Sequence, residues 1–313
     1  MAFASHPASE TGEDTGAALH AAIRSFVSTA SFEMAAGDLD GLEAAKPWLS
    51  AGGMISITWL PKDNHDDRIA ASRALTDAGF VAVPHIAARR IADSGELDRL
   101  LARLALEAGV RRAFLIAGDV PKAQGAFESS LQLLRTGLFE RRGFTTIGIA
   151  GYPEGHPKIS DDLLGFEANA KIATGWRAGM DTEIITQFCF EAPPISQWLA
   201  AFRTRHPQHS VRIGLAGPAG LRTLLHYARL CGLGTSIRAL AGQAGSIARL
   251  LTDAGPDPVI RDLMTDPAVR QQPSVKLHLF PFGGLARTAR WADRVARGDF
   301  TLSMSEAGFR VRQ

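Results

Sequence analysis

Short apolar runs alternate with helical patterns along almost the whole chain. Most runs end in a polar or ionisable residue before the next helical pattern begins. The runs are apolar throughout rather than alternating with polar residues, which is typical of parallel strands buried on both faces. We identify eight such runs, at 31–34, 54–60, 81–87, 112–119, 145–152, 182–190, 211–216 and 274–282.

This succession of strands and helices predicts an α/β fold, a single (β/α)8 barrel of the TIM type. An open doubly wound sheet is the main alternative, but no strand is followed by a convincing Gly-x-Gly-x-x-Gly turn. We expect an extra N-terminal helix over 17–27, a loose tail over 1–16, and one catalytic domain over 17–313. A chain of 313 residues is an ordinary length for one barrel.

Two local features refine this outline. Pro84 lies inside the third run, and a proline within a strand usually indicates a sheet edge or a bulge, so we expect a kink near His85. Ser94 precedes a strong helical pattern over 94–109 and is expected to cap that helix.

Composition narrows the functional class. The net charge is +2, and the basic residues form only small clusters such as Arg89–Arg90, which we interpret as solvated charges. Nothing resembles the basic stripe that tracks phosphates, so no nucleic-acid partner is expected. The polar N-terminus does not resemble a secretory signal, and no stretch is long and apolar enough for a membrane span. Cys189 and Cys231 have no metal-type spacing, and buried free thiols fit a reducing, cytoplasmic location.

The ends of the strands carry the candidate chemistry, because a parallel barrel brings all of them to one face. Glu33 lies within the first run, where burial would raise its pKa and suit a general acid. The alternative is a structural ion pair with a buried basic residue. Asp119 follows Gly118 at the end of the fourth run and could tune a cofactor ring or accept a proton; the alternative is a turn or capping aspartate.

Further polar residues follow the other strands. Gln187 offers both a donor and an acceptor, which suits a planar substrate rich in amides. Tyr152 and His156 belong to the densest polar cluster of the chain, and Lys171 on the next helix could approach an anion or be a solvated lysine. The histidines lack metal-ligand spacing, so we expect no metal site. Without a nucleophile elbow or a phosphate-binding loop, the pattern favours redox or group-transfer chemistry at a planar ligand.

Several of these segments together resemble the methylenetetrahydrofolate reductase family. The segments, in chain order, are FE at 32–33, Thr58, PH at 84–85, AGDVP at 117–121, GYPEGHP at 151–157 and ITQF at 185–188. The resemblance implies a β/α barrel that binds FAD and reduces 5,10-methylenetetrahydrofolate to 5-methyltetrahydrofolate with NADH or NADPH. The expected partners are therefore a folate and a nicotinamide nucleotide.

The resemblance also implies roles for individual residues. Glu33 would be the general acid that activates the folate, and Asp119 would orient the pterin beside the flavin. Gln187 would bind the substrate, and Gln243 is the nearest polar candidate for a further substrate contact. The residues implied for the cofactor are Thr58, His85, Ala117, Gly118, Asp119, Tyr152, His156 and Lys171.

The chain also departs from the family pattern. Ala117 stands where the family frequently has arginine, and few basic residues surround the expected diphosphate. Two alternatives therefore stay open: a reductase that uses NAD(P)H without a flavin, and a non-catalytic folate-binding protein of one-carbon metabolism. Barrels of this kind often associate, so a homo-oligomer stays open too, as do the choice of NADH or NADPH and the physiological direction.

Overall fold

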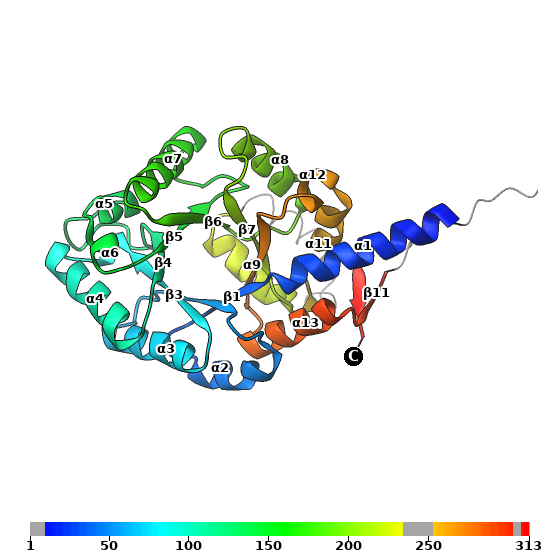
Figure 1. Cartoon of the computed structure of the whole chain (residues 1–313), viewed down its shortest axis with the longest axis horizontal. Helices are drawn as coiled ribbons and strands as arrows, with labels where there is room; N and C mark the ends of the chain where they lie inside the picture. Colours follow the sequence, from blue (N-terminus) through cyan, green and yellow to red (C-terminus); the bar gives the residue numbers. More distant parts are fainter. Residues whose placement is uncertain (1–9, 234–252, 303–307, 313) are drawn as a thin grey trace, which may run out of the picture.

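Eight parallel strands form a closed barrel in the computed structural model, which describes residues 10–233, 253–302 and 308–312 (Figure 1). Around the barrel the strands follow the order β1-β10-β7-β6-β5-β4-β3-β2. Their bounds are β1 Ser31–Met34, β2 Met54–Ile57, β3 Val81–Ala87, β4 Arg112–Ile116, β5 Thr146–Gly151, β6 Asp181–Thr186, β7 Ser210–Ala216 and β10 Val275–Phe280. The (β/α)8 barrel predicted from the apolar runs is confirmed.

The helices cover the outside of the barrel (Figure 1). Between and after the strands lie α2 Leu39–Ala45, α3 His65–Asp77, α4 Ser94–Glu107, α5 Ser130–Leu134, α6 Leu138–Arg141, α7 Asp161–Arg177, α8 Ala192–Arg203, α9 Leu221–Leu230, α11 Asp257–Thr265, α12 Pro267–Arg270 and α13 Leu285–Arg297. Two 3-10 helices, η1 Lys46–Trp48 and η2 Ala88–Arg90, follow α2 and β3. Short two-stranded sheets pair β8 Ala219–Gly220 with β9 Asp253–Ala254, and β11 Phe300–Leu302 with β12 Phe309–Val311.

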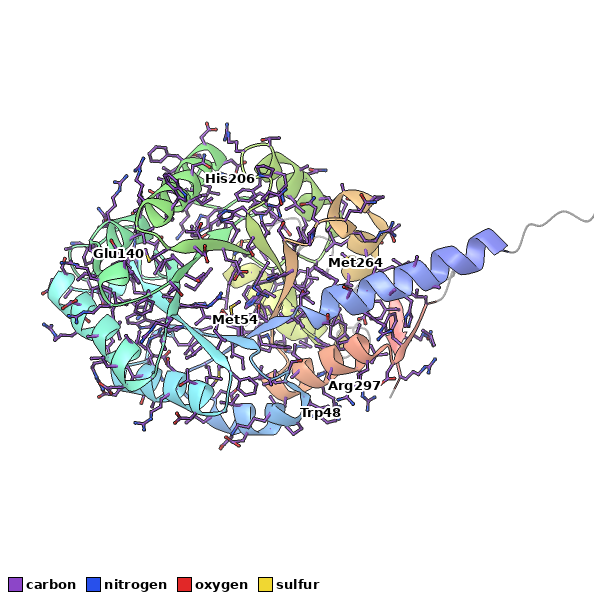
Figure 2. The ribbon with its side chains drawn as sticks, viewed as in Figure 1. Trp48, Met54, Glu140, His206, Met264 and Arg297 are labelled. Atoms are coloured by element: carbon purple, nitrogen blue, oxygen red, sulfur yellow. The ribbon has the colours of Figure 1, made fainter. Side chains whose placement is uncertain are left out.

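The core has two parts because each barrel strand has an inner and an outer face. Inside the barrel, Met54, Val83, Phe114 and Ile185 pack together from four strands. Met54 accordingly lies near the middle of the ring of strands (Figure 2). A larger cluster fills the layer between strands and helices. Burial on both faces is the physical reason why the strands read as unbroken apolar runs.

Helix α1, Glu10–Ser28, begins seven residues before the expected start at residue 17. The residues from 10 to 16 are polar and contribute no apolar periodicity, so the hydrophobic pattern did not extend to the first residues of the helix. Acidic residues such as Glu10 and Glu13 favour the N-terminal end of a helix through its dipole. The helix packs along α13 and α11 and extends beyond the barrel at its N-terminal end (Figure 1).

The sheet edge suggested by Pro84 and the cap expected at Ser94 are both wrong, while the expected kink near His85 stays a prediction. Strand β3 continues through Pro84 and pairs with β2 on one side and β4 on the other, so it is not an edge strand. A closed barrel has no edges, and Pro84 lies opposite Ile57, the last residue of β2. Helix α4 is capped by Asp93, whose carboxylate accepts a hydrogen bond from the Glu96 main-chain N–H at 2.8 Å, rather than by Ser94.

Several strands end before the last residue of the apolar run that predicted them. β2 ends at Ile57, β4 at Ile116 and β6 at Thr186, so Thr58, Asp119 and Gln187 lie in the loops that follow. Main-chain hydrogen bonds still hold these loop residues in order, because Thr58 N–H donates to Met34 O at 2.9 Å and Gln187 N–H donates to Gly151 O at 2.8 Å. Thr58, Asp119 and Gln187 therefore lie on the rim of the barrel, whereas Glu33 and His85 lie within their strands.

Candidate active site

Glu33 and His85 form a buried pair at the end of the barrel where the strands finish. Glu33 Oε1 lies 3.2 Å from His85 Nε2, and the two side chains are only 12% and 11% exposed. Glu33 comes from β1 and His85 from β3, so the pair spans the intervening strand β2. The Phe114 ring packs against the His85 imidazole with 4.8 Å between ring centroids. Both residues were predicted from the sequence, but their contact was not.

The expected direction of the Glu33 pKa is wrong. Burial does raise the pKa, as the sequence implied. The hydrogen bond and charge interaction with His85, together with the charge interaction with His278, outweigh burial and hold the pKa of Glu33 below its ordinary value. Glu33 is thus a carboxylate in contact with an imidazole rather than an isolated acid. The alternative of an ion pair with a buried Arg or Lys does not describe this contact, since the partner is a histidine.

His278 is a buried polar residue that sequence analysis missed. It lies inside β10, is 1% exposed, and its Nδ1 is 2.8 Å from the Ser31 hydroxyl of β1. Burial lowers the pKa of His278 to about 4, so the ring is neutral near pH 7. The residue could have been noticed as the one ionisable position in the apolar stretch LHLF at 277–280.

A second buried ion pair lies away from the candidate site and has a structural role. Glu183 of β6 and Arg212 of β7 are each 10% exposed by side chain, with 3.1 Å between Oε2 and Nε. Ser210 also donates a hydrogen bond to Glu183 at 2.8 Å, and Arg212 donates to the main-chain oxygen of Thr29 at 3.0 Å. Both charges come early in their strands, so this pair lies toward the end of the barrel opposite the candidate site.

Arg68 of α3 fixes the main chain at Thr58, in the loop after β2, and at His85, in β3. Its guanidinium donates to Thr58 O at 2.6 Å and to His85 O, and it lies 4.3 Å from the centre of the Trp59 ring. The side chain is 1% exposed, and burial lowers its pKa to about 10. It therefore stays charged near pH 7. Sequence analysis did not single out Arg68, because a helical arginine gives no signal of burial before the helix is packed.

Asp119 faces solvent and is held by Arg90. Arg90 Nη2 lies 2.6 Å from Asp119 Oδ1; the Arg90 side chain is 8% exposed and that of Asp119 is 60% exposed. The interpretation of Arg90 as a solvated charge is wrong, because its side chain is mostly buried and paired with Asp119. Gly118 has φ of +100°, which a side chain would strain, and this conformation delivers Asp119 to the rim.

The cluster after β5 is held together by ring packing. The Tyr152 and His156 rings meet edge-on with 5.5 Å between centroids. Burial raises the pKa of the Tyr152 hydroxyl, while burial and nearby Lys158 lower the pKa of His156. His156 Nδ1 accepts a hydrogen bond from the Lys158 main-chain N–H at 3.2 Å, so this nitrogen is the unprotonated one in that contact.

Gln187 has a buried amide oxygen without a hydrogen-bond partner among the described residues. Its amide nitrogen donates to the main-chain oxygen of Cys231 at 3.4 Å, which directs the side chain. A buried acceptor without a partner is costly, and a ligand N–H is one means of satisfying it. Gln243, the other residue expected to bind substrate, lies outside the described residues.

The residues expected near a flavin diphosphate offer little positive charge. Ala117 has no side-chain donor, Lys171 pairs with Glu167 at 3.2 Å, and Arg90 is occupied by Asp119. A diphosphate is strongly anionic and is usually held by basic side chains or by a helix N-terminus. These side chains do not fit an FAD diphosphate, and we assign no step to a flavin.

The described residues contain no group of three or more His, Cys, Asp or Glu side chains arranged to hold a metal ion. Within the same part of the chain, no helix has the length and apolar character needed to cross a membrane.

Fold and site together define a β/α-barrel protein that has, where its strands end, a buried carboxylate–imidazole pair and an amide oxygen without a hydrogen-bond partner among the described residues. The family model for methylenetetrahydrofolate reductase matches residues 42–237, more than half of the chain. The protein belongs to the methylenetetrahydrofolate reductase family. The matched segment contains Thr58, His85, Asp119 and Gln187, whereas Glu33 precedes it.

Proposed function

We propose that this protein reduces 5,10-methylenetetrahydrofolate to 5-methyltetrahydrofolate with NADH or NADPH, by direct hydride transfer. Membership of the reductase family supports the folate reaction. The observation that carries the proposal is the buried contact between Glu33 and His85, because a non-catalytic folate-binding protein would not need an ionisable pair there. The poor fit of Ala117 and Lys171 to a diphosphate supports transfer without a flavin.

The reaction needs one proton and one hydride. Protonation of folate N10 breaks its bond to the methylene carbon and leaves an iminium between that carbon and N5. Hydride from C4 of the nicotinamide then forms the third C–H bond of the methyl group, and NAD(P)H becomes NAD(P)⁺. We assign the proton to Glu33, which is the acid on the catalytic face that is both buried and hydrogen-bonded.

The lowered pKa of Glu33 means that this group has to gain a proton before it can act as the acid. In the free protein the carboxylate form is favoured and His85 donates to it. A pterin that covers the pair would exclude water, and burial favours the neutral acid. Glu33 is therefore expected to take up a proton when the substrate binds and to deliver it to N10.

Two rim residues would orient the pterin. Gln187 Oε1, which has no hydrogen-bond partner in the described part of the chain, would accept a hydrogen bond from a pterin N–H. Asp119, held by Arg90, would accept a second one from the solvent side. Such paired polar contacts fix a planar ligand in one orientation, which direct hydride transfer requires.

The test combines an absorbance spectrum with a turnover assay of the purified protein. A colourless protein that oxidises NADH or NADPH only when methylenetetrahydrofolate is present supports the proposal. Flavin released in about equimolar amount by denaturation would show the flavin-dependent reaction instead. Folate binding without nucleotide oxidation would overturn the enzyme assignment in favour of a folate-binding protein.

A further inference from the structure

A cavity of about 630 Å³ lies between helices α7 and α8 on the outside of the barrel. No role has been given to it so far, although it is of the size that binds small molecules. One end begins at the loop after β5, where Tyr152, Pro153 and Glu154 form part of the lining. The other end reaches Arg205 and His206, just after α8. We call this cavity the α7–α8 groove.

Small residues keep the groove open. Gly165 and Ala168 line it from α7, and Ala201 lines it from α8. A Cβ atom added at Gly165 would meet no atom within 4 Å, so the space beside this part of α7 is open. The two helices also have other partners, since α7 packs on α5 and α8 packs on α11 and α12. Successive helices of the barrel are thus separated here instead of sealing the layer.

The wall formed by α8 is aromatic. Trp198 and Phe202 are one helical turn apart, with rings inclined by 8° and centroids 5.2 Å apart. His206 continues the row at 4.8 Å from Phe202 and lies between α7 and α8 (Figure 2). The Trp198 and Phe202 rings are nearly parallel and stacked on one another, and this aromatic wall offers a packing surface for a flat heterocycle.

Polar groups complete the lining. Asn169 Oδ1 lies 2.7 Å from His206 Nε2, which joins the two helices, and Gln197 provides a second amide. Burial and the neighbouring arginines lower the pKa of His206, so its ring is neutral near pH 7. Arg205 therefore supplies the positive charge at this end of the groove. Stacking, amide hydrogen bonds and one cation are the contacts that an adenine nucleotide takes.

We propose that the α7–α8 groove binds the adenosine half of the nicotinamide nucleotide. This inference rests on the proposed function, which needs a hydride donor bound next to the folate. Adenine would stack against Trp198 and Phe202, and Arg205 would face a phosphate. Because the groove begins beside Tyr152 at the end of β5, the rest of the nucleotide can turn onto the catalytic face.

The test fills the groove without removing a contact. Gly165→Leu adds a side chain into open space, and Ala200→Leu adds the same bulk on an exposed part of α8 outside the groove. ADP-ribose binding is measured by calorimetry, and KM for NADH and NADPH by turnover, with circular dichroism to confirm folding. We expect Gly165→Leu to weaken ADP-ribose binding and raise the nucleotide KM at least tenfold, while Ala200→Leu and the folate KM stay unchanged.

Removal of the positive charge of Arg205 provides an independent test of the groove. Arg205→Gln is expected to weaken ADP-ribose binding about tenfold, whereas Arg177→Gln at the exposed end of α7 leaves it unchanged. Equal binding by wild type, Gly165→Leu and Arg205→Gln would overturn the groove assignment even if folate turnover is normal. Conversely, ADP-ribose binding that depends on Gly165 in a protein without folate turnover would support the groove and overturn the proposed reaction.

Discussion

The two halves of the catalytic face differ in how their polar residues are held. On the β1–β3 side, Glu33 and His85 are buried together, and the Arg68 guanidinium fixes the main chain of His85. On the β4–β6 side, Asp119 is mostly exposed, and Lys171 already has an anionic partner. The first half is organised by buried side-chain hydrogen bonds, and the second by local ion pairs at the rim.

This difference separates two tasks. A group that transfers a proton benefits from a low-dielectric site with a fixed partner, because its pKa then responds strongly to the arrival of a ligand. A group that orients a solvated ligand can stay at the rim. There an ion pair positions it while contributing little to the free energy of unfolding. We therefore expect substitutions in the first half to change chemistry, and substitutions in the second half to change mainly binding and orientation.

The largest effect is expected for Glu33→Gln. Removal of the acid should lower the rate of methylenetetrahydrofolate reduction about 10³-fold, as is typical for loss of a general acid. Nucleotide binding should remain within twofold of wild type, measured by ADP-ribose titration. Glu43→Gln, on the exposed side of α2, is the matched control and should leave turnover unchanged. Near-normal turnover in Glu33→Gln would remove Glu33 from the mechanism.

His278→Gln tests the buried half through pH dependence of stability. The unfolded chain takes up a proton on His278 near pH 6.5, but the folded protein does so only at about 4, so folding stability falls as the pH drops between these values. The difference corresponds to about 3 kcal/mol. The free energy of unfolding, measured with denaturant at pH 7 and pH 4, should be less sensitive to acid in His278→Gln by about that amount.

The control for this measurement is His226→Gln, which replaces an exposed histidine on α9. Its acid sensitivity should match that of wild type. If His278→Gln and wild type lose the same stability between pH 7 and pH 4, His278 is not buried in its neutral form.

A smaller effect is expected for Asp119→Asn on the rim. Loss of the negative charge should slow folate reduction about tenfold, through poorer orientation of the pterin. The free energy of unfolding should change by less than about 1 kcal/mol, because Asp119 is mostly exposed. Glu128→Gln is a close control, since Glu128 is equally exposed and pairs with the neighbouring Arg89. An unchanged rate in Asp119→Asn would reduce Asp119 to a turn residue.

The smallest effect is expected for Lys171→Gln. Since Lys171 is paired with Glu167 on the same helix, its removal should change the KM for NADH or NADPH by less than twofold. Arg205→Gln, at the far end of the α7–α8 groove, should change the same KM about tenfold. A larger effect at Lys171 than at Arg205 would place the anionic part of the nucleotide on the β4–β6 rim instead of in the groove.

The local pattern of apolar and polar residues predicted most of the barrel. It failed where the structure at a residue depends on neighbours that are distant in the sequence. The apolar runs located every barrel strand, but they overran the ends of β2, β4 and β6, since apolar loop residues on the rim resemble strand residues. Pro84 suggested an edge because its neighbours on both sides, β2 and β4, were not yet known. Asp93 and Ser94 are both good capping residues, and the backbone geometry selected Asp93.

For the site, the sequence determined which residue types stand at the strand ends, including Glu33, His85 and Gln187, because eight successive strand–helix units can close only by bringing those ends together. Only the tertiary structure decided which of them touch. The contacts of Glu33 with His85, Ser31 with His278 and Arg90 with Asp119 join residues far apart in the chain. Charge and hydrogen bonding act over a few ångströms in space, so a pKa and a partner follow from packing, which sequence spacing alone does not specify.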